Sequence, residues 1–392
     1  GDRLLTLAKV RNEAAEKLGF QNYWDMQIRL QEHDPEQLRA IFAELETFTA
    51  APFKQLKEKI DAELAERFNV PQEKIMPWHY DNPFFQAPPP SAQVDLDDFY
   101  KDKKKEDIIR LAQEFYAGIG LPIENIVKQS DLYEREGKDQ HAFCIDIDRV
   151  GDVRILTNTK PTVEWMDTTL HELGHALYSA GLDFSLPFNL REAAHIFTTE
   201  AVAMLFGALA KNPAWLITNA GADPGRVKEV EAAILEQRRR EQLIFARWTL
   251  VMLHFEKALY ENHGNVKKDL NDLNELWWEM TARFQLLGAP HDRDVRQYAD
   301  WAAKPHFATA PVYYHNYMLG ELFAAQLRAT LVKLAHHNGK TSTLDYNKHP
   351  AFGLFFKEKI FKPGSTKHWT EFVNTVTGEH LTARHFAEEI KD

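Results

Sequence analysis

Apolar residues recur every three or four positions along most of this chain, a spacing typical of amphipathic α-helices. Seven such segments, all rich in strong helix formers, are predicted to be helices: 3–19, 36–68, 104–118, 225–262, 267–287, 311–336 and 380–391. One segment differs. Between His141 and Leu156 apolar and polar residues alternate around Val150-Gly151-Asp152, which predicts a β-hairpin. The predicted fold class is therefore mainly α, with a short hairpin or small sheet.

Two more helices are predicted between the hairpin and residue 213. The apolar stripe of the first consists of Val163, Met166, Leu170, Leu173 and Leu177. Thr162 is expected to cap this helix, and Gly181 to end it in a left-handed turn. The second helix is predicted to begin at Asn189, as its N-cap, and to run to Asn212-Pro213.

A metal-binding motif lies in the first of these two helices, where His171, Glu172 and His175 stand as His-Glu-Leu-Gly-His. Residues i and i+4 share a helical face, so both imidazoles can reach one ion while Glu172 borders the same space. Glu200 lies among apolar residues of the second helix, where a lone carboxylate is costly to bury without a cation or hydrogen bonds. Three protein ligands leave zinc a fourth position for water, so the pattern predicts a hydrolytic zinc site with Glu172 as base. The alternative is surface histidines with an ion-paired glutamate.

A second cluster of polar aromatic residues follows His306. Zinc-dependent hydrolysis of a peptide passes through an oxyanion, which a phenol can stabilise. With Thr309 as N-cap and Pro311 in the first turn, Tyr314 and Tyr317 are predicted to share one face of a new helix. A phenol of that face is a candidate for this role, and a core aromatic cluster is the alternative.

Length, charge and cysteine content narrow the function further. The 392 residues can bury a large core, and we predict a single catalytic domain over 1–392. The net charge of −11 argues against a nucleic-acid partner, and no apolar run is long enough to cross a membrane. Cys144 is the only cysteine, which excludes an internal disulfide. With no signal-peptide pattern at the start, the cytoplasm is favoured, while the periplasm or secretion stays open. The sequence does not indicate an oligomeric state.

Residues 141–200 and 304–326 resemble the angiotensin-converting-enzyme family of zinc peptidyl-dipeptidases. The motifs that carry the resemblance are His141-Ala142, the zinc motif at the family's spacing, Glu200, Lys304, His306, Tyr314 and Tyr317. A weaker similarity begins near Asn12. The resemblance implies a zincin-like helical ellipsoid with a deep cleft, one Zn²⁺ as cofactor, and short peptides as substrates.

The resemblance also implies a role for each site residue. His171, His175 and Glu200 would bind zinc, Glu172 would be the base, and Tyr317 would stabilise the tetrahedral intermediate. The residues that would bind the substrate backbone are His141, His306 and the main chain of Ala142 and Cys144. Lys304 and Tyr314 would hold the substrate's C-terminal carboxylate, because an ammonium and a phenol both donate to that group. This contact would direct cleavage to the bond two residues from the end.

The sequence departs from the family pattern at several positions. The family's third carboxylate-binding residue, a glutamine, aligns best with Tyr80. Asn316 replaces an arginine that serves a chloride site in animal members, so weak or no chloride activation is predicted. Met204 replaces a carboxylate that orients a zinc histidine, so another side chain must take this role. The family's helices before the region of Asn12 are expected to be absent or truncated.

Two other functions stay open. A thimet-like or oligopeptidase-F-like peptidase has the same zinc motif and a similar histidine and tyrosine pair, but cuts inside short peptides. Lys304 separates the two, because only an enzyme that binds the substrate terminus would reject an amidated peptide. The alternative of another class is a non-catalytic zinc-containing peptide-binding protein, which the presence of Glu172 and Tyr317 disfavours.

Overall fold

The computed structural model describes residues 1–90, 94–261, 269–291 and 293–391. The chain is mainly α-helical with one two-stranded antiparallel sheet, which confirms the predicted fold class. Two compact units are present: the first consists mainly of 1–91 and 238–318, the second mainly of 92–237 and 319–390. A single catalytic domain over 1–392 stays a prediction. No helix in the described ranges is both long and apolar enough to span a bilayer.

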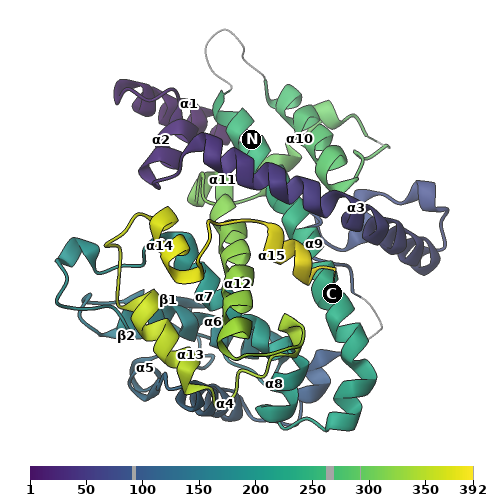
Figure 1. Ribbon diagram of the computed structural model, residues 1–392. Helices are drawn as coiled ribbons and strands as arrows, with labels where there is room; N and C mark the ends of the chain where they lie inside the picture. Colours follow the sequence, from purple (N-terminus) through teal and green to yellow (C-terminus); the bar gives the residue numbers. More distant parts are fainter. Residues whose placement is uncertain (91–93, 262–268, 292, 392) are drawn as a thin grey trace. The chain divides into compact units, whose positions relative to one another are not determined.

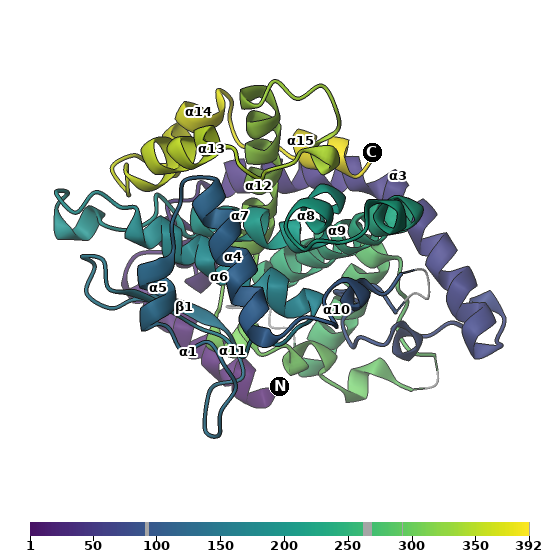
Figure 2. The ribbon, with the colours of Figure 1, turned by 90° about the horizontal axis from the view of Figure 1, so that it is seen from below.

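The boundaries at 237/238 and 318/319 fall within long helices, α9 (Pro224–Glu261) and α12 (His315–Leu334). The other helices of the second unit are α4 (Lys105–Gly118), α5 (Glu124–Gln129), α6 (Val163–Ala180), α7 (Ile196–Gly207), α8 (Pro213–Thr218), α13 (Pro350–Phe355), α14 (Trp369–Thr377) and α15 (Arg384–Glu389). Helices α6 and α7 pack side by side (Figure 1), and α4 packs on α6 (Figure 2). Tyr116 of α4 stabilises the packing of α4 on α6, because its hydroxyl donates a hydrogen bond to the carbonyl of Leu170 at 2.7 Å.

Helix α6 begins as predicted and ends differently. The Thr162 side chain accepts a hydrogen bond from the Trp165 amide, and the apolar stripe from Met166 to Leu177 is buried. Gly181 follows the helix with φ −90°, so the predicted left-handed turn is wrong. Glycine is needed there for space, because a Cβ would lie 2.7 Å from the Cβ of Phe361.

Helix α7 begins at Ile196 rather than after Asn189, so this predicted start is wrong. Residues 188–190 form a 3₁₀ turn instead. The Leu190 carbonyl accepts a hydrogen bond from Ser365 at 3.1 Å, a contact between distant parts of the chain that local spacing does not reveal. His195 then caps α7, its side chain accepting from the Phe197 amide.

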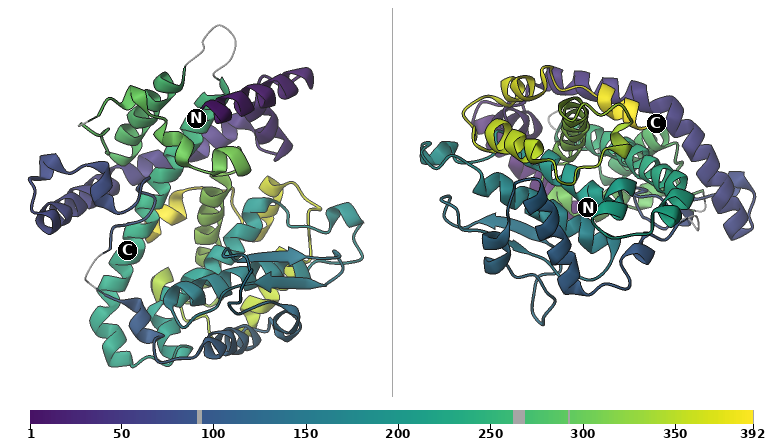
Figure 3. Two further views of the ribbon diagram at one scale, coloured as in Figure 1. Left: turned by 180° about the vertical axis from the view of Figure 1, so that it is seen from behind. Right: turned by 60° about the horizontal axis from the view of Figure 1, so that its bottom comes forward.

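The predicted hairpin is confirmed. Strand β1 (Phe143–Asp146) pairs with β2 (Val153–Leu156) in antiparallel register, with Cys144 opposite Ile155. The hairpin lies beside α6 (Figure 3). Its two apolar faces differ, because Val153 and Ile155 are buried whereas Phe143 and Ile145 are exposed.

The first unit is built around aromatic side chains. Its helices are α1 (Asp2–Lys17), α2 (Tyr23–Leu30), α3 (Pro35–Phe68), α10 (Leu270–Gln285) and α11 (His306–Thr309), together with the adjoining part of α9. The ring of Phe255 on α9 contacts the rings of Trp277, Trp301 and Phe307 at centroid distances of 5.0 to 5.5 Å, and all four side chains are buried.

The seven helices predicted from the spacing are all present, with shifted ends. Helix α12 begins four residues later than predicted, and the C-terminal helix is reduced to α15. Residues 262, 267 and 268 of two predicted helices lie outside the described residues. The pattern did not predict the short helices α2, α5, α8, α11, α13 and α14. They have four to nine residues each and so offer too few turns for a periodic signal.

Candidate active site

The side chains of His171, His175 and Glu200 converge in the second unit. Their candidate ligand atoms all lie within 4.8 Å of one another. The two Nε2 atoms are 3.2 Å apart, and each is 3.8 Å from Oε2 of Glu200. Tetrahedral zinc with bonds of about 2.0–2.2 Å would separate its ligand atoms by roughly 3.3–3.6 Å. These residues therefore fit zinc with only small side-chain rotations.

Both imidazoles are held in the neutral form that binds a metal. Burial lowers the pKa of His175 to about 3, with a further contribution from His171, and burial also lowers the pKa of His171. Nδ1 of His175 lies 2.8 Å from Oγ1 of Thr199. When Nδ1 donates to this hydroxyl, Nε2 carries the lone pair that faces the other ligands. Thr199 is therefore placed to orient the His175 ring, in the role that Met204, at the family's carboxylate position, cannot fill.

Close packing of α6 on α7 brings Glu200 to the histidines. Gly174 lies between the two histidines in sequence, and a Cβ at this position would be 2.8 Å from Cα of Ala203. Only glycine leaves room for the α7 backbone at this distance. The small residue in the His-Glu-Leu-Gly-His motif thus sets the separation of the two helices that supply the ligands.

Glu172 is buried next to the three candidate zinc ligands, His171, His175 and Glu200. Burial raises the pKa of its carboxyl to about 7, and the charge of Glu200 adds to the effect. The pKa of Cys144 is raised to about 12 by burial and by the charges of Glu172 and Asp146. The thiol is therefore protonated at neutral pH and is a poor nucleophile. Glu172 remains the side chain of this group whose proton affinity suits acid–base chemistry near pH 7.

The main chain of Cys144 lies on one edge of strand β1, and Ala142 directly precedes the strand. The Ile147 amide donates to the carbonyl of Asp152, so Ile147 belongs to a hydrogen-bonded pair with β2. Such pairs alternate along antiparallel strands, so the N–H and C=O groups of Cys144 point away from β2. Within the described ranges β1 has no other partner strand. His141, just before this edge, is exposed.

Lys304 and Tyr314 lie together in the first unit, and Gln86 joins them. The Lys304 ammonium donates to Oε1 of Gln86 at 2.7 Å, and the Tyr314 hydroxyl lies 3.4 Å from the same oxygen. Trp248 donates its indole N–H to the Tyr314 hydroxyl at 2.7 Å. Lys304 also faces the rings of Phe84, Trp248 and Tyr314 at 5.0–5.4 Å. We call Lys304, Gln86 and Tyr314 the carboxylate cluster, since all three can donate to an anion.

Sequence reasoning missed Gln86. Tyr80, which aligns with the glutamine of the family, is buried and bonded to Lys57 and Asp61 instead. The Tyr80 hydroxyl is therefore bonded elsewhere, whereas a glutamine six residues later, Gln86, lies beside Lys304. A glutamine in the same loop was the available signal, but the 218 residues that separate it from Lys304 conceal the contact.

His306 and Tyr317 lie next to the carboxylate cluster. The His306 ring is 4.9 Å from the Tyr314 ring and 6.2 Å from the Tyr317 ring. Burial lowers the pKa of His306, and its buried Nδ1 has no hydrogen-bond partner in the described part of the chain. Helix α12 begins at His315, so the predicted start after Thr309 is wrong. Tyr314 thus precedes the helix that carries Tyr317.

Asn316, which stands where animal members of the family have an arginine, is hydrogen-bonded within the chain. Its buried side-chain amide donates to Oε1 of Gln31 at 2.8 Å, and its oxygen lies 3.3 Å from Nε2 of His33. A neutral amide in these contacts supplies no positive charge for an anion. This arrangement agrees with the predicted weak chloride activation, which stays a prediction.

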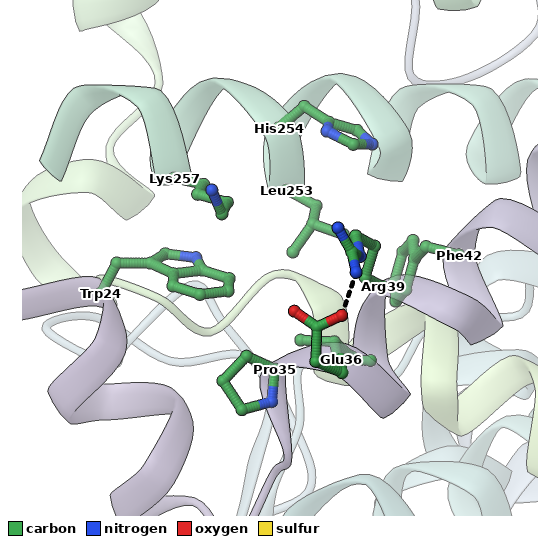
Figure 4. Close-up of a pocket in the computed structure, with 9 residues that line it drawn as sticks. Trp24, Pro35, Glu36, Arg39, Phe42, Leu253, His254 and Lys257 are labelled. Carbon is green, nitrogen blue, oxygen red and sulfur yellow. Dashed lines mark hydrogen bonds and ion pairs between the residues drawn. The ribbon is translucent and has the colours of Figure 1, made fainter. Parts of the chain in front are cut away.

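A separate apolar pocket of about 210 Å³ lies between α2, α3 and α9 of the first unit (Figure 4). Trp24, Leu253 and Phe42 line it, and an ion pair between Glu36 and Arg39 lies at its side. None of the predicted site residues lines this pocket.

Comparison with known proteins gives a family that matches most of the chain and several relatives of low identity. The family model of angiotensin-converting enzyme, Peptidase_M2, matches residues 5–388. Angiotensin-converting enzymes of Mesocricetus auratus and Oryctolagus cuniculus are 23% and 24% identical over 278 and 274 residues, or 69% and 68% of this chain. Carboxypeptidase 1 of Bacillus subtilis (strain 168) is 23% identical over 344 residues, 77% of this chain and 66% of the relative. The matches cover 20% of the length of the two angiotensin-converting enzymes.

Proposed function

Because this chain belongs to the angiotensin-converting enzyme family of peptidases, we propose that it is a zinc peptidyl-dipeptidase that releases C-terminal dipeptides from short peptides. The observation that carries the proposal is the convergence of two imidazoles and a carboxylate at separations that suit one zinc ion. Family membership by itself implies peptide hydrolysis. The ligand geometry and the carboxylate cluster support the finer assignment.

His171, His175 and Glu200 would hold the metal. Zinc, when bound, polarises the substrate carbonyl and lowers the pKa of a water molecule. Glu172 accepts the proton of that water and returns it to the leaving amine, which suits a carboxyl whose pKa is about 7. Tyr317 is proposed to donate its phenolic hydrogen to the developing oxyanion, as in the family pattern.

The position of the cleaved bond would be set by the substrate terminus. The buried Lys304 supplies a positive charge, and Gln86 and Tyr314 supply neutral donors beside it. A carboxylate that replaces the Lys304–Gln86 contact would gain a charge-assisted hydrogen bond. The edge of β1 at Ala142 and Cys144 would pair with the peptide main chain, and the unpaired Nδ1 of His306 offers it a further contact.

The test is mass spectrometry of the products from one peptide supplied with a free and with an amidated C-terminus. Dipeptide release from the free form alone supports the proposal. Internal cleavage of both forms would indicate an oligopeptidase, and release of single amino acids would indicate a carboxypeptidase. Glu172→Gln is the control, because an amide cannot act as the base. Undiminished cleavage by this variant would refute the assigned role of Glu172.

A further inference from the structure

A strained backbone residue lies just before the helix that carries Tyr317. Nine described residues other than glycine have positive φ, and Val312, at φ 53°, is the only β-branched residue among them. A β-branched side chain is rarely found in this region because its γ carbons crowd the backbone. Such a conformation persists only where surrounding contacts hold it.

The side chains of Glu256 and Gln31 bond to the peptide groups of Val312 on both sides. Its N–H donates to Oε1 of Glu256 at 2.8 Å, and its carbonyl accepts from Nε2 of Gln31 at 2.8 Å. Glu256 and Val312 are both buried. The same Gln31 accepts from Asn316 in the first turn of α12. Gln31 therefore bonds both to the turn before α12 and to the first turn of α12 itself.

The protonation of Glu256 suits a buried acceptor for the Val312 amide. Burial raises the pKa of its carboxyl to about 8, against the opposing effects of the Val312 amide and Arg11. At neutral pH most molecules therefore carry a protonated Glu256, which needs no buried counter-charge and still offers an oxygen to the amide. Arg11 ties the preceding turn as well, because its guanidinium donates to the carbonyls of Phe307 and Ala308.

The chain segment that carries Gln86 has a similar arrangement. Phe85, at φ 45°, lies directly before Gln86. Its carbonyl accepts from Nε2 of Gln285 at 2.7 Å, and Gln285 is buried. Each chain segment that brings a neutral donor to Lys304 thus has a left-handed residue within two positions of that donor. In both cases a buried polar side chain from a distant element holds it.

We propose that Glu256 and Gln285 are positioning residues that hold Val312 and Phe85 in their left-handed conformations and so set the geometry of Tyr314 and Gln86 around Lys304. The proposal rests on the proposed function, in which this cluster binds the substrate carboxylate. Neither side chain is assigned a contact with substrate. Each acts through one backbone group.

The experiment compares two variants at one position. Glu256→Met removes the acceptor at similar volume, whereas Glu256→Gln keeps an oxygen for the Val312 amide. For a peptide with a free C-terminus, Glu256→Met should lower kcat/KM about tenfold or more, mainly through KM, because small displacements of binding groups have effects of this order. Glu256→Gln should stay close to wild type. Gln285→Met should resemble Glu256→Met.

Asn274→Leu is the matched control for a loss of stability. Asn274 is buried in the same unit, and its side chain forms hydrogen bonds with Val295 and Asp300. Asn274→Leu should lower the unfolding temperature while KM stays unchanged. An equal rise of KM in Asn274→Leu, or a wild-type KM in Glu256→Met, would overturn the proposal.

Hydrogen exchange separates this proposal from the proposed function. Backbone amides of residues 310–317 should exchange faster in Glu256→Met than in wild type and Glu256→Gln. This readout does not depend on catalysis. If the wild type cleaves no peptide, the proposed function fails while the exchange rates still test the backbone contact. Equal exchange in all three proteins would refute the positioning role.

Discussion

The pH dependence of peptide binding should follow the charge of Lys304. Burial lowers the pKa of this ammonium to about 8, and its nearest hydrogen-bond acceptor is the neutral Gln86. The lysine is charged below that pH and neutral above it. With a pKa of about 8, the charged fraction falls from roughly 0.9 at pH 7 to roughly 0.1 at pH 9, so kcat/KM for free-carboxylate peptides should fall about tenfold.

The assay is the pH profile of kcat/KM for the wild type and two variants. Lys304→Arg keeps its charge throughout this range, so the decline near pH 8 should disappear even if the absolute rate is lower. Lys304→Met should raise KM at pH 7 by about 10- to 100-fold, the effect of losing a charge-assisted hydrogen bond of about 1.5–3 kcal/mol. Any residual cleavage of an amidated peptide should lack the decline.

Persistence of the same decline in Lys304→Arg would refute this reasoning, because the titrating group would then lie elsewhere. A wild-type KM in Lys304→Met would also refute it, because it would show that Lys304 does not bind the substrate terminus. Thermal unfolding of each variant should accompany the kinetics. A folded Lys304→Met protein is required for the comparison.

Three further outcomes are expected. Gly174→Ala would place a Cβ 2.8 Å from Cα of Ala203, so calorimetry should show a loss of about 1–3 kcal/mol of stability together with weaker zinc binding. Thr199→Val removes the oxygen that lies 2.8 Å from His175 and should weaken zinc about 10- to 100-fold in a chelator competition; unchanged affinity would exclude this orienting role. Because the pKa of Glu256 is raised to about 8 on folding, its stabilising effect is present below the unfolded pKa and is lost as pH rises to 8. Denaturant unfolding should therefore show an advantage of Glu256→Gln that grows between pH 5 and pH 8 by on the order of 3–5 kcal/mol, and a constant difference would contradict it.

Features that depend on near neighbours could be predicted from the sequence. The i, i+4 spacing places His171 and His175 on one face of α6, and the cap at Thr162 begins that helix where expected. The alternation between His141 and Leu156 predicts the hairpin. Glu200 is a functional candidate because it is an ionisable residue within an otherwise apolar helix. These properties arise from helix and strand geometry and from the cost of burying charge, both of which act over a few residues.

Tertiary contacts determine two features of the structure that near neighbours in the sequence do not predict. Gln86 rather than Tyr80 accompanies Lys304 because a loop more than 200 residues away packs beside it. The start of α12 is delayed because the Val312 amide is bonded to Glu256 and its backbone turns left-handed. A helix signal extends through Val312 only while its amide N–H has no better partner, and Pro311 has no N–H to bond. Hydrogen bonds between residues distant in sequence can outweigh a local preference of a few tenths of a kcal/mol per residue, and no spacing along the chain records them.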